Sequence, residues 1–309
     1  MKKIFNLLLL IFVRNKKIII LASVLLLLII FIVLLRMYFN KQYNITMIKK
    51  IESFNARCGY SYHGAVSQKI LVINYVDEFN FREIIRLLPL IQEPFSISFS
   101  GGATLTQNDI DILAQTPHVT EIDLIECKFY PDDLILKKLA FCKKLKIIGL
   151  TCRDSSMSLP IKAICSLPQI TTLGIIASKV SADDFEHVIN LPLIGLDMTA
   201  SFISNDHILT ILKCNSLEYL TLYKCSFTDI ASVRMLTKMK KIKLINLSGC
   251  AIPVKILDAF IDHQSLEEII IDRTKLCEDD INLIKAYSRK LPKIKGTAIQ
   301  ITNNISDQH

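Results

Sequence analysis

A repeat of about 25 residues constrains the fold of this chain more than any other feature of its sequence. The template of the repeat has apolar residues at its first, fourth, sixth and eleventh positions and a small residue at its ninth. Copies begin at residues 70, 94, 119, 145, 170, 193, 217, 242, 266 and 291; the first two are weaker, the fourth is looser and the last is partial. One such unit cannot bury its apolar side alone, so the repeat predicts a solenoid of stacked coils.

The copy that contains LTLYKCSF, residues 220–227, shows the pattern most clearly. Its apolar positions and its ninth position are filled by Leu217, Leu220, Leu222, Phe227 and Cys225. The pattern resembles that of the leucine-rich repeat family, LxxLxLxx(N/C)xL, and the resemblance covers about residues 70–296. It implies an α/β solenoid, a horseshoe with a parallel inner β-sheet and outer helices, of the ribonuclease-inhibitor-like or cysteine-containing subtype.

The second half of each repeat predicts a helix, for example over residues 181–194 and 227–242. Ser181, Ser204 and Thr228 stand where a helix N-cap is needed, and each has an acidic residue soon after it. Lysines gather at the other end of these segments, where they would face the negative end of the helix dipole.

The ninth position decides whether the cysteines point to chemistry or to architecture. A nucleophile or metal ligand needs fixed partners, whereas this position accepts several residue types, so we expect side chains that cap backbone groups. Nine cysteines without a CxxC pair, and histidines without metal-ligand spacing, predict no catalytic residue, cofactor or metal site. We expect Cys225 and Cys250 to be neighbouring reduced thiols. Down the repeats the position holds Gly102, Cys127, Arg153, Ser178, Ser201, Cys225, Cys250 and Thr274.

The apolar run 18–35 predicts a transmembrane helix over residues 18–36, because about 20 apolar residues span a bilayer. No small-residue cleavage site follows it, which favours an uncleaved signal-anchor. We expect a basic interfacial segment at 1–17, a linker and N-terminal cap at 37–69, the repeats at 70–296 and a polar tail at 297–309.

The charge distribution bears on partners and on membrane orientation. Residues 1–36 hold six basic and no acidic residues, which leaves 31 basic against 29 acidic residues elsewhere, so no nucleic-acid partner is expected. The positive-inside rule favours an orientation in which the repeats lie outside the cytoplasm. The cysteine usage favours a reducing compartment, which leaves the cytoplasmic side open as an alternative.

The predicted function is a non-catalytic protein-binding platform that uses the concave face of the solenoid and acts on no small-molecule substrate. An alternative is a cytoplasmic-facing substrate adaptor for a modifying enzyme such as a ubiquitin ligase, although no F-box-like helical segment precedes the repeats. A third possibility is an enzyme in residues 37–69 built on Cys58 and His63, which lacks a third, orienting group. The candidate partner-binding residues are Glu121, Asp123, Asp197, Tyr219, Thr221, Tyr223, Lys224, Asn246, Glu268, Asp272 and Arg273.

Overall fold

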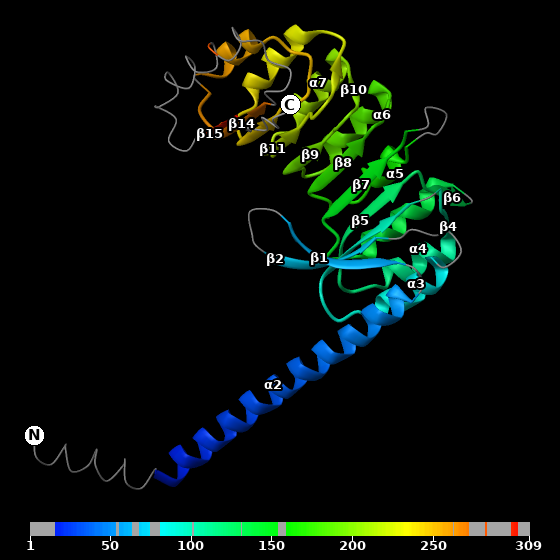
Figure 1. Ribbon diagram of the computed structural model, residues 1–309, viewed down its shortest axis with the longest axis vertical. Coiled ribbons are helices and arrows are strands. Elements are labelled where there is room, and N and C mark those ends of the chain that lie inside the picture. The colour runs from blue at the N-terminus through cyan, green and yellow to red at the C-terminus, as the bar shows by residue number, and fades with distance from the viewer. Residues whose placement is uncertain are drawn as a thin grey trace, which may run out of the picture. The chain divides into compact units, whose positions relative to one another are not determined.

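The computed structural model divides the chain into two units, Met1–Lys50 and Ile51–His309 (Figure 1). The residues it describes are 16–53, 56–63, 68–74, 81–100, 102–130, 132–153, 159–261, 263–271, 282 and 298–301. For residues 16–24, 59–63, 68–70, 74, 254 and 298–301 the description covers the backbone alone.

The described part of the first unit belongs to one helix, α2, Lys16–Glu52. Its 37 residues make a rod about 55 Å long. The large apolar side chains from Leu25 to Leu35 are exposed, with 37% to 65% of each accessible. Within the described residues, the helix Leu25–Glu52 contains an 18-residue window with a mean hydropathy of 1.7, so it is long and apolar enough to cross a membrane or to serve as a signal sequence.

The second unit is built on an 11-stranded sheet whose strands follow one another in chain order. The first pair, β1 with β2, is antiparallel, and all later pairs are parallel. Figure 1 shows the helices of the coils along one side of this sheet, so the predicted α/β solenoid is confirmed. The strands are β1 Arg57–His63, β2 Gln68–Asn74, β3 Phe95–Phe99, β5 Val119–Ile125, β7 Ile147–Thr151, β8 Thr172–Ile176, β9 Gly195–Asp197, β11 Tyr219–Thr221, β13 Leu244–Asn246, β14 Glu268–Ile271 and β15 Ala298–Ile301.

The fourth and sixth positions of the repeat form the core, as the pattern predicts. In the coil of β11, Leu220 and Leu222 are fully buried, and Ile245 and Leu247 take the same places one coil later. Parallel strands in register put these side chains in continuous stacks, and each buried aliphatic side chain contributes about 1.5–3 kcal/mol of transfer free energy.

Short parallel pairs of outer strands connect neighbouring coils on the helix side of the turns. β4, Thr104–Thr106, pairs with β6, Lys128–Tyr130, and β10, Phe202–Ile203, pairs with β12, Ser226–Phe227. Among the described residues, the coils of β7 and β8 between these two pairs carry no outer strand.

The helical halves of the coils are shorter and more varied than the sequence predicts. The segment 181–194 contains the α-helix α6 and the 3₁₀ helix η3, and the segment 227–242 contains the 3₁₀ helix η4 alone. The described helices of this unit are α3 Phe81–Leu87, η1 Leu88–Leu90, α4 Gln107–Ala114, η2 Asp133–Phe141, α5 Ile161–Ile164, α6 Ala182–Glu186, η3 His187–Asn190, α7 Asn205–Lys213, η4 Ile230–Lys238 and η5 Val254–Phe260.

Two of the three predicted N-caps are confirmed. The Ser181 hydroxyl accepts from the backbone N–H of Asp184, and the Ser204 hydroxyl accepts from that of His207. The prediction of Thr228 is wrong, because Asp229 caps η4 by accepting from the backbone N–H of Ala231 at 2.8 Å.

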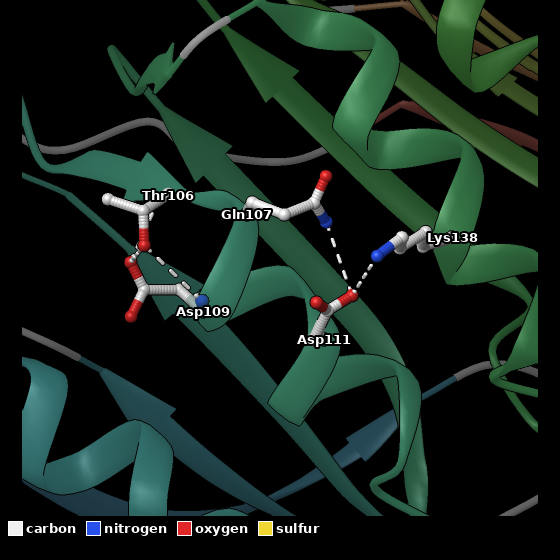
Figure 2. A network of polar contacts seen from close by, with 5 residues as sticks. All are labelled: Thr106, Gln107, Asp109, Asp111 and Lys138. Atoms are coloured by element: carbon white, nitrogen blue, oxygen red, sulfur yellow. Dashed lines mark hydrogen bonds and ion pairs between the residues drawn. The ribbon is translucent and has the colours of Figure 1, made fainter.

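A capping box begins α4 and connects it to the next coil (Figure 2). The buried Asp109 carboxylate accepts from the Thr106 hydroxyl at 2.6 Å and from the Thr106 backbone N–H at 2.8 Å. Two residues later, the Asp111 carboxylate accepts from Gln107 at 3.2 Å and from the Lys138 ammonium of η2 at 2.6 Å. These contacts satisfy N-terminal groups of α4 and fix its register against η2.

The two ends of the sheet differ from the sequence expectation. The N-terminal cap is an antiparallel hairpin of β1 and β2, which the repeat pattern does not indicate. At the other end, β15 lies inside the segment 297–309 that is predicted to be a polar tail, and Ala298 pairs with Glu268. In this strand the polar Gln300 lies between Ile299 and Ile301, an alternation that suits a strand, and the predicted partial copy at residue 291 lies outside the described residues.

Candidate functional site

The ninth position of the repeat forms a ladder of side-chain hydrogen bonds between coils. The donors are thiols or hydroxyls, and each acceptor is the carbonyl of the sixth position in the preceding coil. We call this set the ninth-position ladder. Its members are Cys127 to Phe99 at 3.6 Å, Ser201 to Ile175 at 2.9 Å, Cys225 to Met198 at 2.8 Å and Cys250 to Leu222 at 2.8 Å.

The environment of these thiols suits a structural role rather than a reactive one. Burial raises the pKa of Cys127 and of Cys225 to about 12. A nucleophile or metal ligand needs the thiolate, which such an environment disfavours. All eight cysteines that the structure describes are free, and Cys225 and Cys250 lie at equivalent positions of consecutive coils.

The residue before each ladder position has a left-handed backbone. Its φ is +54° at Glu126, +53° at Ala177, +56° at Ala200 and +56° at Lys224. This turn directs the ninth side chain inward, toward the preceding coil. Gly249 takes the same place with φ of +72°.

After β3 the ladder position lies one residue later than the sequence predicts. Gly102 has φ of +75° and occupies the left-handed place, whereas the buried Ala103 takes the ninth position. The Ala103 carbonyl accepts from Lys128, as that of Ser201 accepts from Ser226 in a later coil. The turn after β3 holds one extra residue, which the template cannot detect because both glycine and alanine are small.

Arg153 is also not a ladder residue, contrary to prediction. The Cys152 backbone N–H donates to the Ile176 carbonyl, as that of Ala177 donates to Thr199, so Cys152 takes the place before the ladder. Cys152 is 5% exposed and Arg153 projects outward. The remaining predicted ladder residue, Thr274, lies outside the described residues.

The face of the sheet opposite the helices, here called the open sheet face, carries seven of the eleven predicted partner-binding residues in two rows. Strand pairing confirms that equivalent residues of successive coils are direct neighbours. One row is Glu121, Ile147, Thr172, Gly195, Tyr219, Leu244 and Glu268, and the other is Ser98, Asp123, Gly149, Gly174, Asp197, Thr221, Asn246 and Ile270.

The middle of the open sheet face is a floor of glycines bordered by a carboxylate. Gly149 pairs with Asp123 on one side and with Gly174 on the other. A Cβ on Gly149 would lie 2.1 Å from the Asp123 carboxylate oxygen, so that carboxylate already fills the space above the glycine. Glu121, although predicted to bind a partner, is only 9% exposed.

Two other predicted binding residues use an oxygen to hold the backbone. The Asp197 carboxylate accepts from both the backbone N–H and the hydroxyl of Thr199, at 2.8 and 2.6 Å. The Asn246 side-chain carbonyl accepts from the Ser248 backbone N–H at 3.0 Å. These bonds shape the ends of β9 and β13 in the way typical of Asp and Asn turns.

The coil of β11 presents the most prominent side chains of the open sheet face. Tyr219 is 39% exposed, and the Lys224 ammonium lies 4.9 Å from the centre of the Tyr223 ring. The aliphatic part of Lys224 lies over Gly249: a Cβ added to Gly249 would be 2.7 Å from Lys224 Cγ. The Lys224 side chain therefore has the Tyr223 ring near its ammonium group and Gly249 next to its Cγ.

An ion pair between Glu218 and Lys243 borders Tyr219, and the sequence did not predict it. The Lys243 ammonium lies 2.6 Å from the Glu218 carboxylate, and both side chains are partly exposed. Their hydrogen bond raises the pKa of Lys243. The signal is present in the sequence as opposite charges at equivalent places in consecutive repeats.

The remaining predicted sites are not brought together in a functional cluster. Asp272 and Arg273 lie outside the described residues. Cys58 and His63 belong to β1, and burial with the nearby Glu52 charge raises the pKa of Cys58 to about 12, which is unfavourable for a nucleophile. Among the described residues, no group of three or more His, Cys, Asp or Glu side chains could hold a metal ion.

Comparison with known proteins finds no matching family model and no matching curated protein. Two similar solved structures are internalin C2 from Listeria monocytogenes and a TLR13–ssRNA13 complex. Internalin C2 has 14% identity and a TM-score of 0.39, over 64% of this chain and 84% of its own. TLR13 has 18% identity and a TM-score of 0.38, over 65% of this chain and only 27% of its own length.

Proposed function

We propose that this chain is a membrane-anchored, non-catalytic platform that binds another protein through the C-terminal half of its open sheet face. The observation that carries this proposal is the Tyr223–Lys224 pair. Its ring and ammonium are held together at 4.9 Å, and Lys224 is further fixed over Gly249. Tyrosine and cationic side chains that are already ordered lose little entropy on binding, which suits a protein interface.

The neighbouring residues extend this surface. Tyr219 and Thr221 belong to the same strand, and the Glu218–Lys243 ion pair borders Tyr219. Asn246 and Glu268 continue the two rows into the next coils. An aromatic centre with a charged rim is the usual composition of an interface hot spot. Asp123 and Asp197 flank Gly149 and Gly174 on opposite sides and would limit how an acidic partner could approach.

A double variant tests the binding surface. Tyr219→Ala with Tyr223→Ala is expected to abolish capture of the partner by the full-length protein from its native membranes. The matched control is Tyr130→Ala, which removes a tyrosine that is 68% exposed on the outer strand β6. Equal capture by the double variant and the wild type would contradict the proposed surface, provided that both have the same circular dichroism spectrum.

We also propose that α2 anchors the protein in a membrane as an uncleaved helix. The unburied apolar side chains from Leu25 to Leu35 support this anchor, and Tyr38 and Phe39 follow it where aromatic residues favour the membrane interface. Carbonate extraction of membranes tests it: the full-length chain should stay in the pellet, and Leu27→Lys with Phe31→Lys should release it. Release of the wild type would contradict anchoring.

The cysteines of the ninth-position ladder are relevant to the side of the membrane on which the repeats lie. Cys225 and Cys250 can donate hydrogen bonds only as reduced thiols, which favours the cytoplasmic side over the orientation indicated by flanking charge. Labelling of intact cells with an impermeant maleimide tests this. A cysteine introduced by Ser216→Cys should be protected and one introduced by Lys3→Cys labelled; the reverse pattern would place the body outside.

A further inference from the structure

The described structure has a hollow where the ninth-position ladder is interrupted. The hollow has a volume of about 310 Å³ and lies next to the outer strand β10. Its lining includes Arg153, Ser178, Lys179 and Phe202, and the other lining residues are alanine, serine and cysteine. The volume is near the lower end of the range for small-molecule sites, about 300–1,000 Å³.

The interruption arises from the coil of β7. Its ladder position is lost because Cys152 takes the preceding place and Arg153 projects outward. In the next coil, Ser178 is 5% exposed, yet its hydroxyl has no hydrogen-bond partner among the described residues. By the register of the ladder, it would face the Leu150 carbonyl. A buried hydroxyl without a partner costs about 1–3 kcal/mol, so a ligand that accepts its hydrogen bond would be stabilised.

The backbone of the next residue, Lys179, also differs from its equivalents in other coils. In the coils with outer strands, the residue after the ladder position donates its backbone N–H to the preceding coil, as Lys128 does to Ala103 and Phe202 does to Ser178. Within the described part of the chain, Lys179 makes no equivalent bond. The consecutive residues Ser178 and Lys179 both line the hollow.

The charge of the lining selects the kind of ligand. Arg153 and Lys179 contribute two positive charges, and among the described residues the lining contains no carboxylate. Phe202 is 46% exposed at the same hollow and offers an apolar surface. Guanidinium, ammonium, hydroxyl and backbone N–H groups together are the donor set that proteins use for phosphate and carboxylate oxyanions.

We propose that this hollow binds a small molecule carrying an oxyanion, a phosphate or a carboxylate, with its apolar part against Phe202. Arg153 and Lys179 provide the charge, and Ser178 lines the same hollow with a buried hydroxyl that has no partner among the described residues. The site lies on the turn side of the coils, it involves none of the open-sheet-face residues, and it stands independently of the partner-binding proposal.

Calorimetric titration of the full-length protein in a neutral detergent tests this site. The probes are phenyl phosphate, benzoate, inorganic phosphate and, without an oxyanion, phenol. We expect saturable binding of phenyl phosphate or benzoate with a Kd on the order of 1 mM or tighter, weaker binding of inorganic phosphate, and none of phenol. Tighter binding of phenyl phosphate identifies the oxyanion as a phosphate, and tighter binding of benzoate identifies it as a carboxylate. Absence of saturable binding by both would overturn the proposal.

Three variants separate a specific site from general charge attraction. Arg153→Gln with Lys179→Gln should weaken binding by at least about tenfold, and Ser178→Ala should weaken it by a smaller factor. The matched control is Lys128→Gln, which removes a lysine at the place equivalent to Lys179 in a coil with an intact ladder. Equal loss in this control, or no loss in the double variant, would overturn the proposal. Circular dichroism of each variant confirms that it is folded.

Discussion

The Cys225 thiol donates a hydrogen bond to the backbone carbonyl of Met198, 2.8 Å away in the preceding coil. Ser201 makes the same bond to Ile175 at 2.9 Å, one coil earlier. The two residue types are interchangeable here because the position needs a small side chain with one donor. The cysteines of the ninth-position ladder therefore join neighbouring coils by hydrogen bonds.

This equivalence predicts the effect of two substitutions at one position. Cys225→Ser should change the free energy of unfolding little, because the hydroxyl can replace the thiol as donor. Cys225→Ala removes one of two hydrogen bonds to the Met198 carbonyl, which still accepts from the Ser201 backbone N–H at 3.1 Å, and should destabilise the protein by about 0.5–1.5 kcal/mol. Urea unfolding followed by circular dichroism measures both. Serine and alanine variants of equal stability would show that the bond contributes nothing.

The strand half of the repeat is predictable because alternation fixes which side chains face inward. Leu220 and Leu222 are buried, and Thr221 lies in the predicted row on the open sheet face. The sequence cannot reveal that Glu121 is 9% exposed, because this depends on how the neighbouring residues Ser96 and Ile147 pack around it.

The turn and helix halves are less predictable because several residues satisfy the same local requirement. Thr228 and Asp229 are both good N-caps, and the choice of Asp229 depends on where η4 packs. Gly102 fits a small position as well as Ala103 does, so one extra residue in the turn goes unnoticed. The hollow beside Ser178 results from such a local irregularity and has no signature of its own in the sequence.

The left-handed turn before the ladder predicts substitutions of opposite sign. Ala200→Gly should stabilise the protein by up to about 1 kcal/mol, because φ of +56° strains any residue with a Cβ. Gly249→Ala should destabilise it by about 1–2 kcal/mol, since it adds the same strain at φ of +72° and brings Cβ to 2.7 Å from Lys224 Cγ. Thermal unfolding of the two variants compares them directly; a shift in the same direction for both would contradict the role of φ.

The buried His207 predicts a loss of stability in acid. Its Nδ1 atom lies 2.6 Å from the Ser204 hydroxyl and 3.2 Å from the Ser204 backbone N–H, while Nε2 lies 3.1 Å from the Val180 carbonyl. This arrangement suits a neutral ring with its proton on Nε2. Burial lowers the pKa of His207 below 6.5, and the Val180 carbonyl and the Asp206 charge oppose part of that shift.

The sign of the pH effect follows from this lowered pKa. The unfolded chain binds a proton near pH 6.5 and the folded chain only at lower pH, so stability is complete above pH 6.5 and falls as the pH drops from there toward the folded-state pKa. Thermal unfolding between neutral and acidic pH should show this decline. His207→Gln keeps a capping side chain and should give a shallower decline than the wild type; an unchanged slope would show that His207 is not responsible.

Thiol labelling tests the packing of the coils without any substitution. Burial raises the pKa of Cys127, Cys142 and Cys165 to about 12, and that of Cys214 to about 11. Alkylation requires the thiolate and access to it, so iodoacetamide at mildly alkaline pH should leave these four cysteines largely unmodified in the folded protein and modify all of them in urea. Peptide mass spectrometry assigns the labelled positions, and the neutral-pH circular dichroism spectrum confirms that the unlabelled sample is folded. Rapid labelling of Cys142, whose thiol donates to the Leu113 carbonyl at 3.0 Å, would show that the contact between α4 and η2 opens readily in solution.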